Sequence, residues 1–228
     1  MVSSDSNFLF CRYTLHMLEK LPDTVGHALR NRRAGLDQIA FNNSGLRSGM
    51  GSLQVGSLAF ADYAPIPERY TADGEGVSPP LQWTGVPNNA TSLVLIVEDA
   101  DSPTPRPLVH AIAVDLPALD SSLAQGAITD SGEQADTVHE GRNSYFLADW
   151  LPPDPPPGHG RHRYAFQLFA LGPGEPFKGK PGRDEVMGAV RQRGLASGCL
   201  IGTYERPDGS IPARQAGDVS ASVARLRS

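Results

Sequence analysis

The sequence has little cysteine and no long hydrophobic run: two of its 228 residues are cysteine. Cys11 and Cys199 make a poor disulfide framework, and Cys199 lies in a short apolar stretch where we expect a buried side chain. This cysteine usage fits a reducing compartment, so the sequence predicts a cytoplasmic protein. No stretch reaches the roughly 18 apolar residues of a membrane span. The N-terminus lacks the basic segment and apolar core of a secretory signal.

Basic residues are outnumbered by acidic ones, with 20 Lys and Arg against 25 Asp and Glu and a formal net charge of −5. Nucleic acid is therefore not expected as the main partner, because phosphate backbones are bound by clustered Lys and Arg. Apolar residues make up 39% of the chain and charged residues 20%, which excludes wholesale disorder. The 24 Gly and 20 Pro predict the many turns of an all-β architecture.

Residues 1–50 differ from the rest and predict a helical N-terminal extension followed by a linker. Residues 13–21 and 21–29 each carry apolar side chains at helical spacing, and three arginines follow within residues 30–33. We expect these helices to pack on the body or across a homodimer, with the homodimer as the first choice. A membrane-surface or nucleic-acid arm is the weaker alternative, since arginines near a helix C-terminus also complement the helix dipole.

From residue 53 onward the pattern is that of β-strands. Residues 92–97, 108–116 and 164–171 are nearly continuous apolar runs, as expected for strands that are covered on both faces. Residues 53–60, 81–83 and 199–204 predict further strands, and residues 183–195 predict a helix. The fold class is therefore expected to be mainly β.

Two polar segments lie at the edges of these predicted strands. Asp99 and Asp101 follow the first long strand, with His110 in the next one, and His162 and Tyr164 begin a third. Strand parity places His162 and Tyr164 on one face, and it does the same for Asp99 and Asp101 if the chain stays extended. A carboxylate beside an imidazole orients the ring and favours its cationic form, which can donate to phosphate, sulfate or carboxylate.

Each of these residues also has a purely structural interpretation. Aspartates before a proline-rich loop often cap turns, and a single histidine in an apolar strand is often a satisfied core residue. A metal-dependent or His/Asp hydrolase is a further alternative. However, local metal-ligand spacing is missing, and the sequence contains no Gly-X-Ser-X-Gly motif. We therefore expect no catalytic residue, no metal and no cofactor.

Several segments together resemble the phosphatidylethanolamine-binding protein family, in its bacterial and archaeal, Raf-kinase-inhibitor-like branch. The resemblance rests on SPPLQW at 78–83, DADSP at 99–103, His110, GHGRHRY at 158–164 and IGTYER at 201–206. It covers roughly residues 53–207, in the family's order. It implies a large antiparallel sheet packed against a smaller sheet, with flanking helices, in a β domain at 51–210. Residues 211–228 are expected to form a flexible tail.

The resemblance also implies a pocket for a small anionic ligand such as phosphate, phosphorylethanolamine or a phospholipid head group. The pocket positions carry over to the following residues: Asp99, Asp101, His110, His162 and Tyr164. By strand parity, Arg163 points the other way and is expected to form an ion pair that braces a loop. The implied function is non-catalytic binding, and a regulator that binds a phosphorylated protein partner is the alternative. Ala100, Ser102 and Ala111 depart from the family pattern, so we expect an altered rim.

Overall fold

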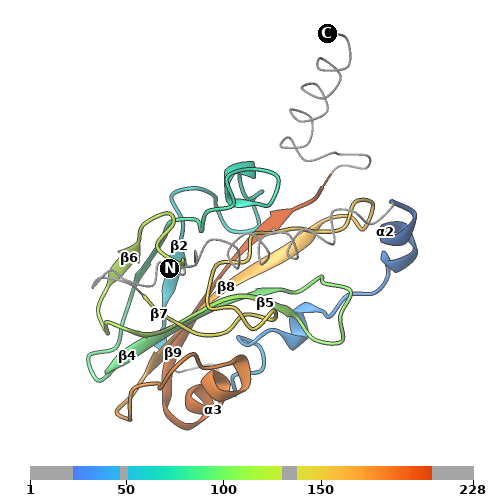
Figure 1. The fold of residues 1–228 in the computed structure, drawn as a ribbon. Coiled ribbons are helices and arrows are strands. Elements are labelled where there is room, and N and C mark those ends of the chain that lie inside the picture. The colour runs from blue at the N-terminus through green and yellow to red at the C-terminus, as the bar shows by residue number, and fades with distance from the viewer. Residues whose placement is uncertain (1–22, 47–50, 130–137, 207–228) are drawn as a thin grey trace, which may run out of the picture.

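A computed structural model describes residues 23–46, 51–129 and 138–206, which form two packed β-sheets with few helices (Figure 1). This is the mainly β fold that the sequence predicts. The helix expected at 13–21 and the tail expected at 211–228 lie outside the described residues. No helix in the described part of the chain is both long and apolar enough to cross a bilayer.

The larger sheet has the strand order β1-β9-β8-β4-β5-β7, and its neighbours from β9 to β7 run antiparallel. The short β1 adds a parallel edge next to β9. The bounds in sheet order are Gly51–Ser52, Gly194–Tyr204, His162–Leu171, Ser92–Asp99, Leu108–Leu116 and His139–Glu140. The smaller antiparallel sheet has the order β2-β3-β6, with bounds Gln54–Gly56, Leu81–Thr84 and Ser121–Leu123.

Both faces of the larger sheet are covered, which explains the continuous apolar runs. On one face of β4, Leu93 and Leu95 belong to the core that includes Trp83 of the smaller sheet. On the other face, Ile96 packs with Met187 of the helix α3, Arg183–Arg193. Alternate residues of one strand therefore serve two different cores, as the pleat of a β-strand requires.

Helix α3 passes directly into β9. The helix ends at Arg193 and the strand begins at Gly194, whose backbone N–H still bonds to the Val190 carbonyl. The sequence pattern predicts a helix to residue 195 and a strand from residue 199. The difference arises because Gly194 pairs with Leu171 of β8, so sheet hydrogen bonds begin where helical ones end. A short 3₁₀ turn, η2 at Glu68–Tyr70, lies in the loop before β3.

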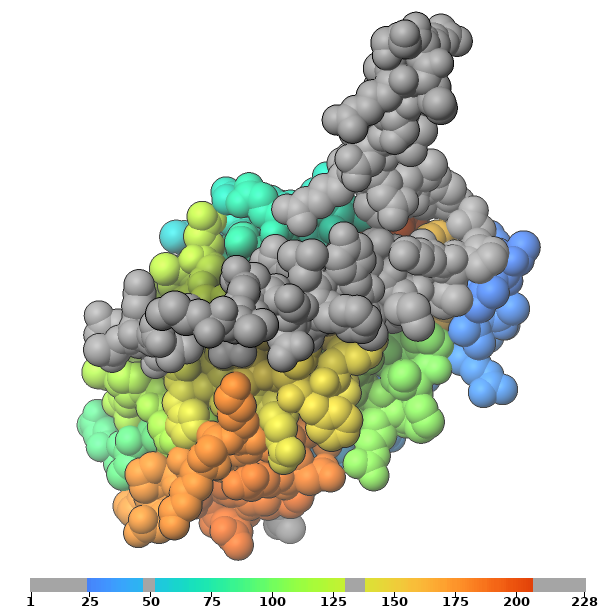
Figure 2. Space-filling view, in the orientation of Figure 1, coloured from blue at the N-terminus to red at the C-terminus, as the bar shows by residue number. Residues whose placement is uncertain are grey.

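The N-terminal segment packs against the body of the same chain. It contains α2 at Asp23–Leu29 and a 3₁₀ turn, η1, at Leu36–Gln38. Beyond η1, the backbone N–H of Ala40 donates to the buried Glu98 carboxylate, and that of Phe41 donates to Gln167. Figure 2 shows this blue segment at one edge of the molecule, beside the green loop that follows β4. Residues 40 and 41 are thus hydrogen-bonded to the large sheet, immediately before the stretch from residue 42 that the sequence suggests as a linker.

Candidate functional site

Three adjacent strands bring the predicted polar residues to one end of the larger sheet. Asp99 is the last residue of β4, His162 is the first of β8, and His110 lies near the start of β5. Because β4 lies between β8 and β5 and is antiparallel to both, its end meets their beginnings. The register pairs Asp99 with Tyr164 on one side and with Leu108 on the other.

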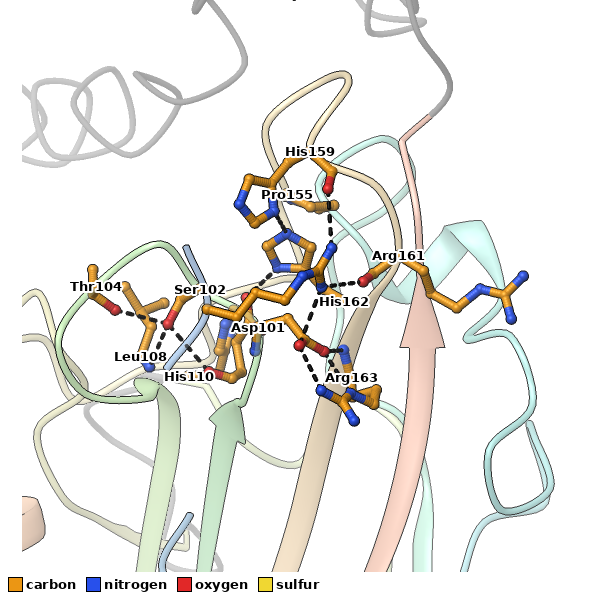
Figure 3. A network of polar contacts seen from close by, with 12 residues as sticks. Asp101, Ser102, Thr104, Leu108, His110, Pro155, His159, Arg161, His162 and Arg163 are labelled. Atoms are coloured by element: carbon orange, nitrogen blue, oxygen red, sulfur yellow. Dashed lines mark hydrogen bonds and ion pairs between the residues drawn. The ribbon is translucent and has the colours of Figure 1, made fainter. Parts of the chain in front are cut away.

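The buried Asp99 carboxylate orients His162. Its Oδ2 lies 2.7 Å from His162 Nδ1, and its Oδ1 accepts the backbone N–H of Asp101 at 2.8 Å. His162 Nε2 lies 2.6 Å from Nδ1 of His159 (Figure 3). His159 Nε2 lies 2.9 Å from the carbonyl oxygen of Leu29. A chain of hydrogen bonds therefore runs from β4 through two imidazoles to helix α2.

His110 has one ring nitrogen engaged and one without a protein partner. Its Nδ1 lies 2.6 Å from the carbonyl oxygen of Leu151, so Nδ1 carries the proton and donates. Nε2 is buried and has no hydrogen-bond partner. Burial lowers the pKa of His110, and the nearby Asp99 charge offsets this only in part. In the neutral ring, Nε2 is a hydrogen-bond acceptor.

These groups border a cavity of about 140 Å³. Much of its wall is apolar and comes from a proline-rich segment at 151–156, and Tyr145 and Asp154 contribute further polar groups. The lining residues are Asp99, Ser102, Pro103, Thr104, Leu108, His110, Tyr145, Leu151, Pro152, Asp154, Pro155, Pro156 and His162. Apolar walls strengthen the electrostatic interactions of the few polar groups between them.

Asp101 lies outside this cavity, unlike the arrangement expected from an extended chain. The backbone turns at Ala100 and Asp101, so the side chain of Asp101 points to the other side. It accepts two side-chain hydrogen bonds from Arg163 and forms an ion pair with Arg33 (Figure 3). Burial opposes its ionisation, but the two arginines outweigh burial and hold the pKa of Asp101 below its ordinary value. Arg163 thus forms the bracing ion pair that strand parity predicts.

Tyr164 lies behind the two histidines and does not line the cavity. Its ring is fully buried and meets His110 edge-on, with 5.1 Å between ring centroids, and it stacks against His162 at 6.3 Å. Its hydroxyl is buried without a hydrogen-bond partner. Burial raises the pKa of Tyr164 well above its ordinary value, so the phenol stays neutral. Tyr164 therefore supports the rings that border the cavity.

The loop between β4 and β5 is braced by Ser102, a position where the sequence departs from the family pattern. Its hydroxyl bonds to Thr104 Oγ1 at 2.7 Å and accepts the backbone N–H of Leu108 at 3.2 Å. A serine at this position thus fixes the loop through side-chain bonds. Within the described residues, no group of three or more His, Cys, Asp or Glu is placed to hold a metal ion.

Three residues of the site were not predicted from the sequence: His159, Asp154 and Tyr145. His159 lies within the GHGRHRY segment, but nothing in its spacing shows that it bonds to His162. Asp154 lies within the proline-rich segment at 151–156. The composition of this segment is the one sequence signal that it forms a wall of the cavity. Tyr145 stands in a loop without a motif. The Leu29 contact is made by a backbone carbonyl, which every residue type carries.

The family model of the phosphatidylethanolamine-binding proteins matches residues 56–205. A UPF0098 protein of Methanothermobacter thermautotrophicus is 37% identical over 148 residues, which cover 65% of this chain and 95% of the relative. A UPF0098 protein of Chlamydia pneumoniae is 37% identical over 162 residues, with 68% and 99% of the two chains covered.

Solved structures agree with this match. A phosphatidylethanolamine-binding protein homologue from Chlamydia trachomatis has a TM-score of 0.61 and 34% identity, covering 68% of this chain and 98% of the other. YbcL of E. coli has a TM-score of 0.62 and 25% identity, with 68% and 99% covered. The family match, the two sheets and the strand-end cavity thus coincide in one region. The chain belongs to the phosphatidylethanolamine-binding protein family, in its prokaryotic UPF0098/YbcL branch.

Proposed function

We propose that this protein binds, without chemical conversion, a small molecule that carries a phosphate or carboxylate group. The main support for this proposal is His110 Nε2, a buried ring nitrogen that borders the cavity and has no protein hydrogen-bond partner. Buried polar groups are nearly always paired in native proteins, so an unpaired one beside a cavity favours a ligand atom at that position. The family's name, phosphatidylethanolamine-binding protein, supports a phosphate-bearing ligand.

The carboxylates at the cavity do not oppose this proposal, because each is balanced by a cation or donor. Asp99 accepts from His162 and from a backbone N–H. Asp154 forms an ion pair with the buried Arg206 at 2.6 Å. The remaining donors for an anion are the hydroxyl of Tyr145 and, once protonated, His110. Burial and the Asp154 charge raise the pKa of Tyr145, so its phenol keeps its proton and can donate.

The size of the cavity favours a head group over a whole lipid. Its volume of about 140 Å³ is well below the roughly 300–1,000 Å³ of sites that enclose drug-sized ligands. A phosphate with a short substituent fits such a space, and any longer chain would extend past the proline-rich rim. Phosphorylethanolamine is therefore the first ligand to test.

The proposal assigns no reaction to the cavity. Among the cavity residues, Ser102 carries the hydroxyl group that is closest in sequence to Asp99. This hydroxyl bonds to Thr104 and to the backbone. Neither His110 nor His162 is placed to activate it as a nucleophile. The alternative of a hydrolase would gain support from a phosphate-ester hydrolysis that His110→Ala removes.

Calorimetric titration with phosphate and phosphorylethanolamine tests the proposal. The wild-type protein should bind, and His110→Ala should reduce the affinity by at least about tenfold, the loss expected for one hydrogen bond to a charged group. His139→Ala is the matched control, because His139 lies outside the cavity and bonds to Asp115. Absence of binding in the wild type, or equal binding in the His110 variant, would contradict the proposal.

A second candidate function, recognition of a phosphorylated protein, is favoured by an arginine-lined hollow of about 510 Å³ beside the cavity. Its lining residues are Arg30, Arg33, Asp101, Gly160, Arg161, Arg163 and Glu205. Four guanidinium groups against two carboxylates leave this hollow positive, and planar guanidinium groups bind phosphate bidentately. A phosphopeptide that binds while its unphosphorylated form does not, with binding lost in Arg161→Ala, would favour this function.

We also propose that the protein acts in the cytoplasm as a homodimer. Light scattering on the full chain and on a chain that lacks residues 1–22 tests the assembly. The proposal expects twice the monomer mass for the full chain and the monomer mass after truncation.

A further inference from the structure

Helix α2 lies against the loop that carries His159. Gly26 of α2 approaches this loop so closely that an added Cβ would overlap the carbonyl oxygen of Pro157 and lie 3.1 Å from the backbone nitrogen of His159. Farther along, Arg33 donates to the carbonyl oxygens of His159 at 3.0 Å and Arg161 at 2.7 Å. Residues 26–33 therefore hold the His159 loop from outside at several points. Figure 1 shows α2 at the end of the sheet where β8 begins.

The Leu29 carbonyl determines which nitrogen of the His159 ring carries a proton. Because a carbonyl only accepts, His159 Nε2 must carry a proton and donate to it. The remaining nitrogen of His159, Nδ1, lies 2.6 Å from His162 Nε2 and is occupied by that contact. His162 Nε2 is therefore committed to His159.

A ring nitrogen that already bonds to a protein group is not available to a ligand. His162 borders the cavity beside His110, yet both of its nitrogens are engaged, one by Asp99 and one by His159. Each ring nitrogen makes one good hydrogen bond. An anion in the cavity can therefore bond to His162 only if His159 first moves away.

We propose that residues 23–35 form an autoinhibitory strap, which keeps His159 on His162 and thereby weakens anion binding in the cavity. The inference rests on the proposed anion-binding function and adds a means of regulating the same site. Displacing the strap frees Nε2 of His162, so that two histidines instead of one face the ligand.

The strap can detach without unfolding the sheets. The family match begins at residue 56, so the strap lies outside it. The side chains of Thr24, His27 and Ala28 on α2 are exposed, and those of Val25 and Leu29 are only half-buried. Segments with few buried apolar contacts open locally at a fraction of the global unfolding free energy. The strap is held by polar contacts, not by a buried apolar face: the Leu29 carbonyl accepts from His159, and the Arg33 side chain donates to two carbonyls and pairs with Asp101. At its end, the backbone N–H groups of Ala34 and Gly35 donate to the carbonyls of Ser102 and Ala100.

Gly26→Ala in the full-length chain tests the strap. The added methyl group forces α2 away from Pro157, while alanine keeps or improves the helix itself. Gly188→Ala is the matched control, because Gly188 lies in α3 and an added Cβ there meets nothing within 4 Å. Two properties are measured: the ¹⁵N shifts of the His159 and His162 rings without ligand, and the affinity for inorganic phosphate.

We expect Gly26→Ala to shift both pairs of ring signals and to raise phosphate affinity by about tenfold, the change for one additional hydrogen bond to a charged group. Gly188→Ala should change neither property. Unchanged ring signals, or an unchanged or weaker affinity with altered signals, would overturn the strap while leaving the binding function intact. If neither the wild type nor Gly26→Ala binds phosphate, the proposed function fails, and with it the regulatory role.

A second variant acts on the other side of the contact. His159→Ala removes the ring that occupies His162 Nε2 and leaves Gly26 in place. It should raise phosphate affinity to the same degree, and combining it with Gly26→Ala should give no further increase. Additive gains in the double variant would show that Gly26 acts by another route and would overturn the inference.

Discussion

His110 donates its Nδ1–H to the carbonyl of Leu151 at 2.6 Å, so the other nitrogen of this buried ring meets the cavity as an acceptor. Burial also lowers the pKa of His110 and keeps the ring neutral in the free protein at neutral pH. An anion, however, requires a donor at this position. Binding of an anion and protonation of His110 should therefore be coupled.

The coupling predicts that anion affinity rises as pH falls. An anion stabilises the imidazolium, so the pKa of His110 is higher in the complex than in the free protein. Affinity increases by up to about tenfold per pH unit between these two pKa values and levels off below the lower one. Sulfate is the suitable probe in calorimetry from pH 8 to 5, because it does not titrate in this range. His110→Gln should bind weakly and without this slope; an equal slope in that variant would contradict the coupling.

Asp101→Asn should destabilise the fold without weakening ligand binding. The change removes the charge that Arg163 and Arg33 hold, and we expect the free energy of unfolding to fall by about 2 kcal/mol at pH 7. Urea unfolding measures this loss, and phosphate affinity should not fall, because Asp101 lies outside the cavity.

The difference in the free energy of unfolding between the wild type and Asp101→Asn should shrink in acid. The pKa of Asp101 is lowered in the folded protein, so its stabilising effect is present above its ordinary value of 3.8 and is lost as pH falls through the lowered value. Asp184→Asn serves as the control, because Asp184 is exposed and lies 3.7 Å from Arg106. A constant difference down to pH 2 would contradict the ion-pair explanation.

Arg206→Met should weaken both the fold and anion binding. Arg206 is fully buried between Asp73 and Asp154, and these carboxylates raise its pKa although burial opposes its charge. Its removal leaves two carboxylates without their cation, and we expect a loss of about 3 kcal/mol in the free energy of unfolding. Because Asp154 lines the cavity, its uncompensated charge should also lower phosphate affinity.

Arg69→Met is the control for this prediction, since the ion pair between Arg69 and Glu75 is exposed and contributes little. Thermal unfolding and phosphate titration are measured on both variants. Phosphate affinity that is unchanged in Arg206→Met would show that Asp154 is balanced by another group.

Cys199 should react slowly with thiol reagents in the folded protein. Burial raises the pKa of its thiol to about 12, and the charges of Asp62 and Glu98 add to this effect. The thiolate is the reactive form, so little of it exists at pH 8. Mass spectrometry of the Cys199 peptide after iodoacetamide treatment should show modification in urea but little without it. The structure leaves Cys199 half-buried, whereas the sequence predicts a buried side chain. Equal modification in both conditions would show that this partial burial does not protect the thiol.

The long strands could be predicted from the sequence, but the short strands β6 and β7 could not. The placement of His162 and Tyr164 on one strand face could also be predicted, because strand parity is local. The same rule fails for Asp101, since a turn at Ala100 replaces the extended backbone that parity assumes. Beyond the turn, the Asp101 carboxylate meets Arg33, which is far away in the sequence. The side chains that Asp101 meets are thus a tertiary property.

The contact between His159 and Leu29 is harder still to predict. The two residues are 130 positions apart, and the acceptor is a main-chain carbonyl with no signal of its own. Helical spacing predicts that residues 21–29 form a helix, but it does not show which surface the helix meets. Such contacts depend on the path of the whole N-terminal segment.

Glu98 joins three parts of the chain, and this limits where the protein can be shortened. Its buried carboxylate accepts from the Ala40 backbone, from Gln167 and from Arg183. A shortened chain that starts after residue 46 would leave Glu98 without the Ala40 donor and would uncover the part of the large sheet's face where Ala40 packs near Ile96. Expression designs that remove the extension should therefore keep residues 36–46, and insolubility of a shorter version would reflect this lost donor instead of any role in assembly.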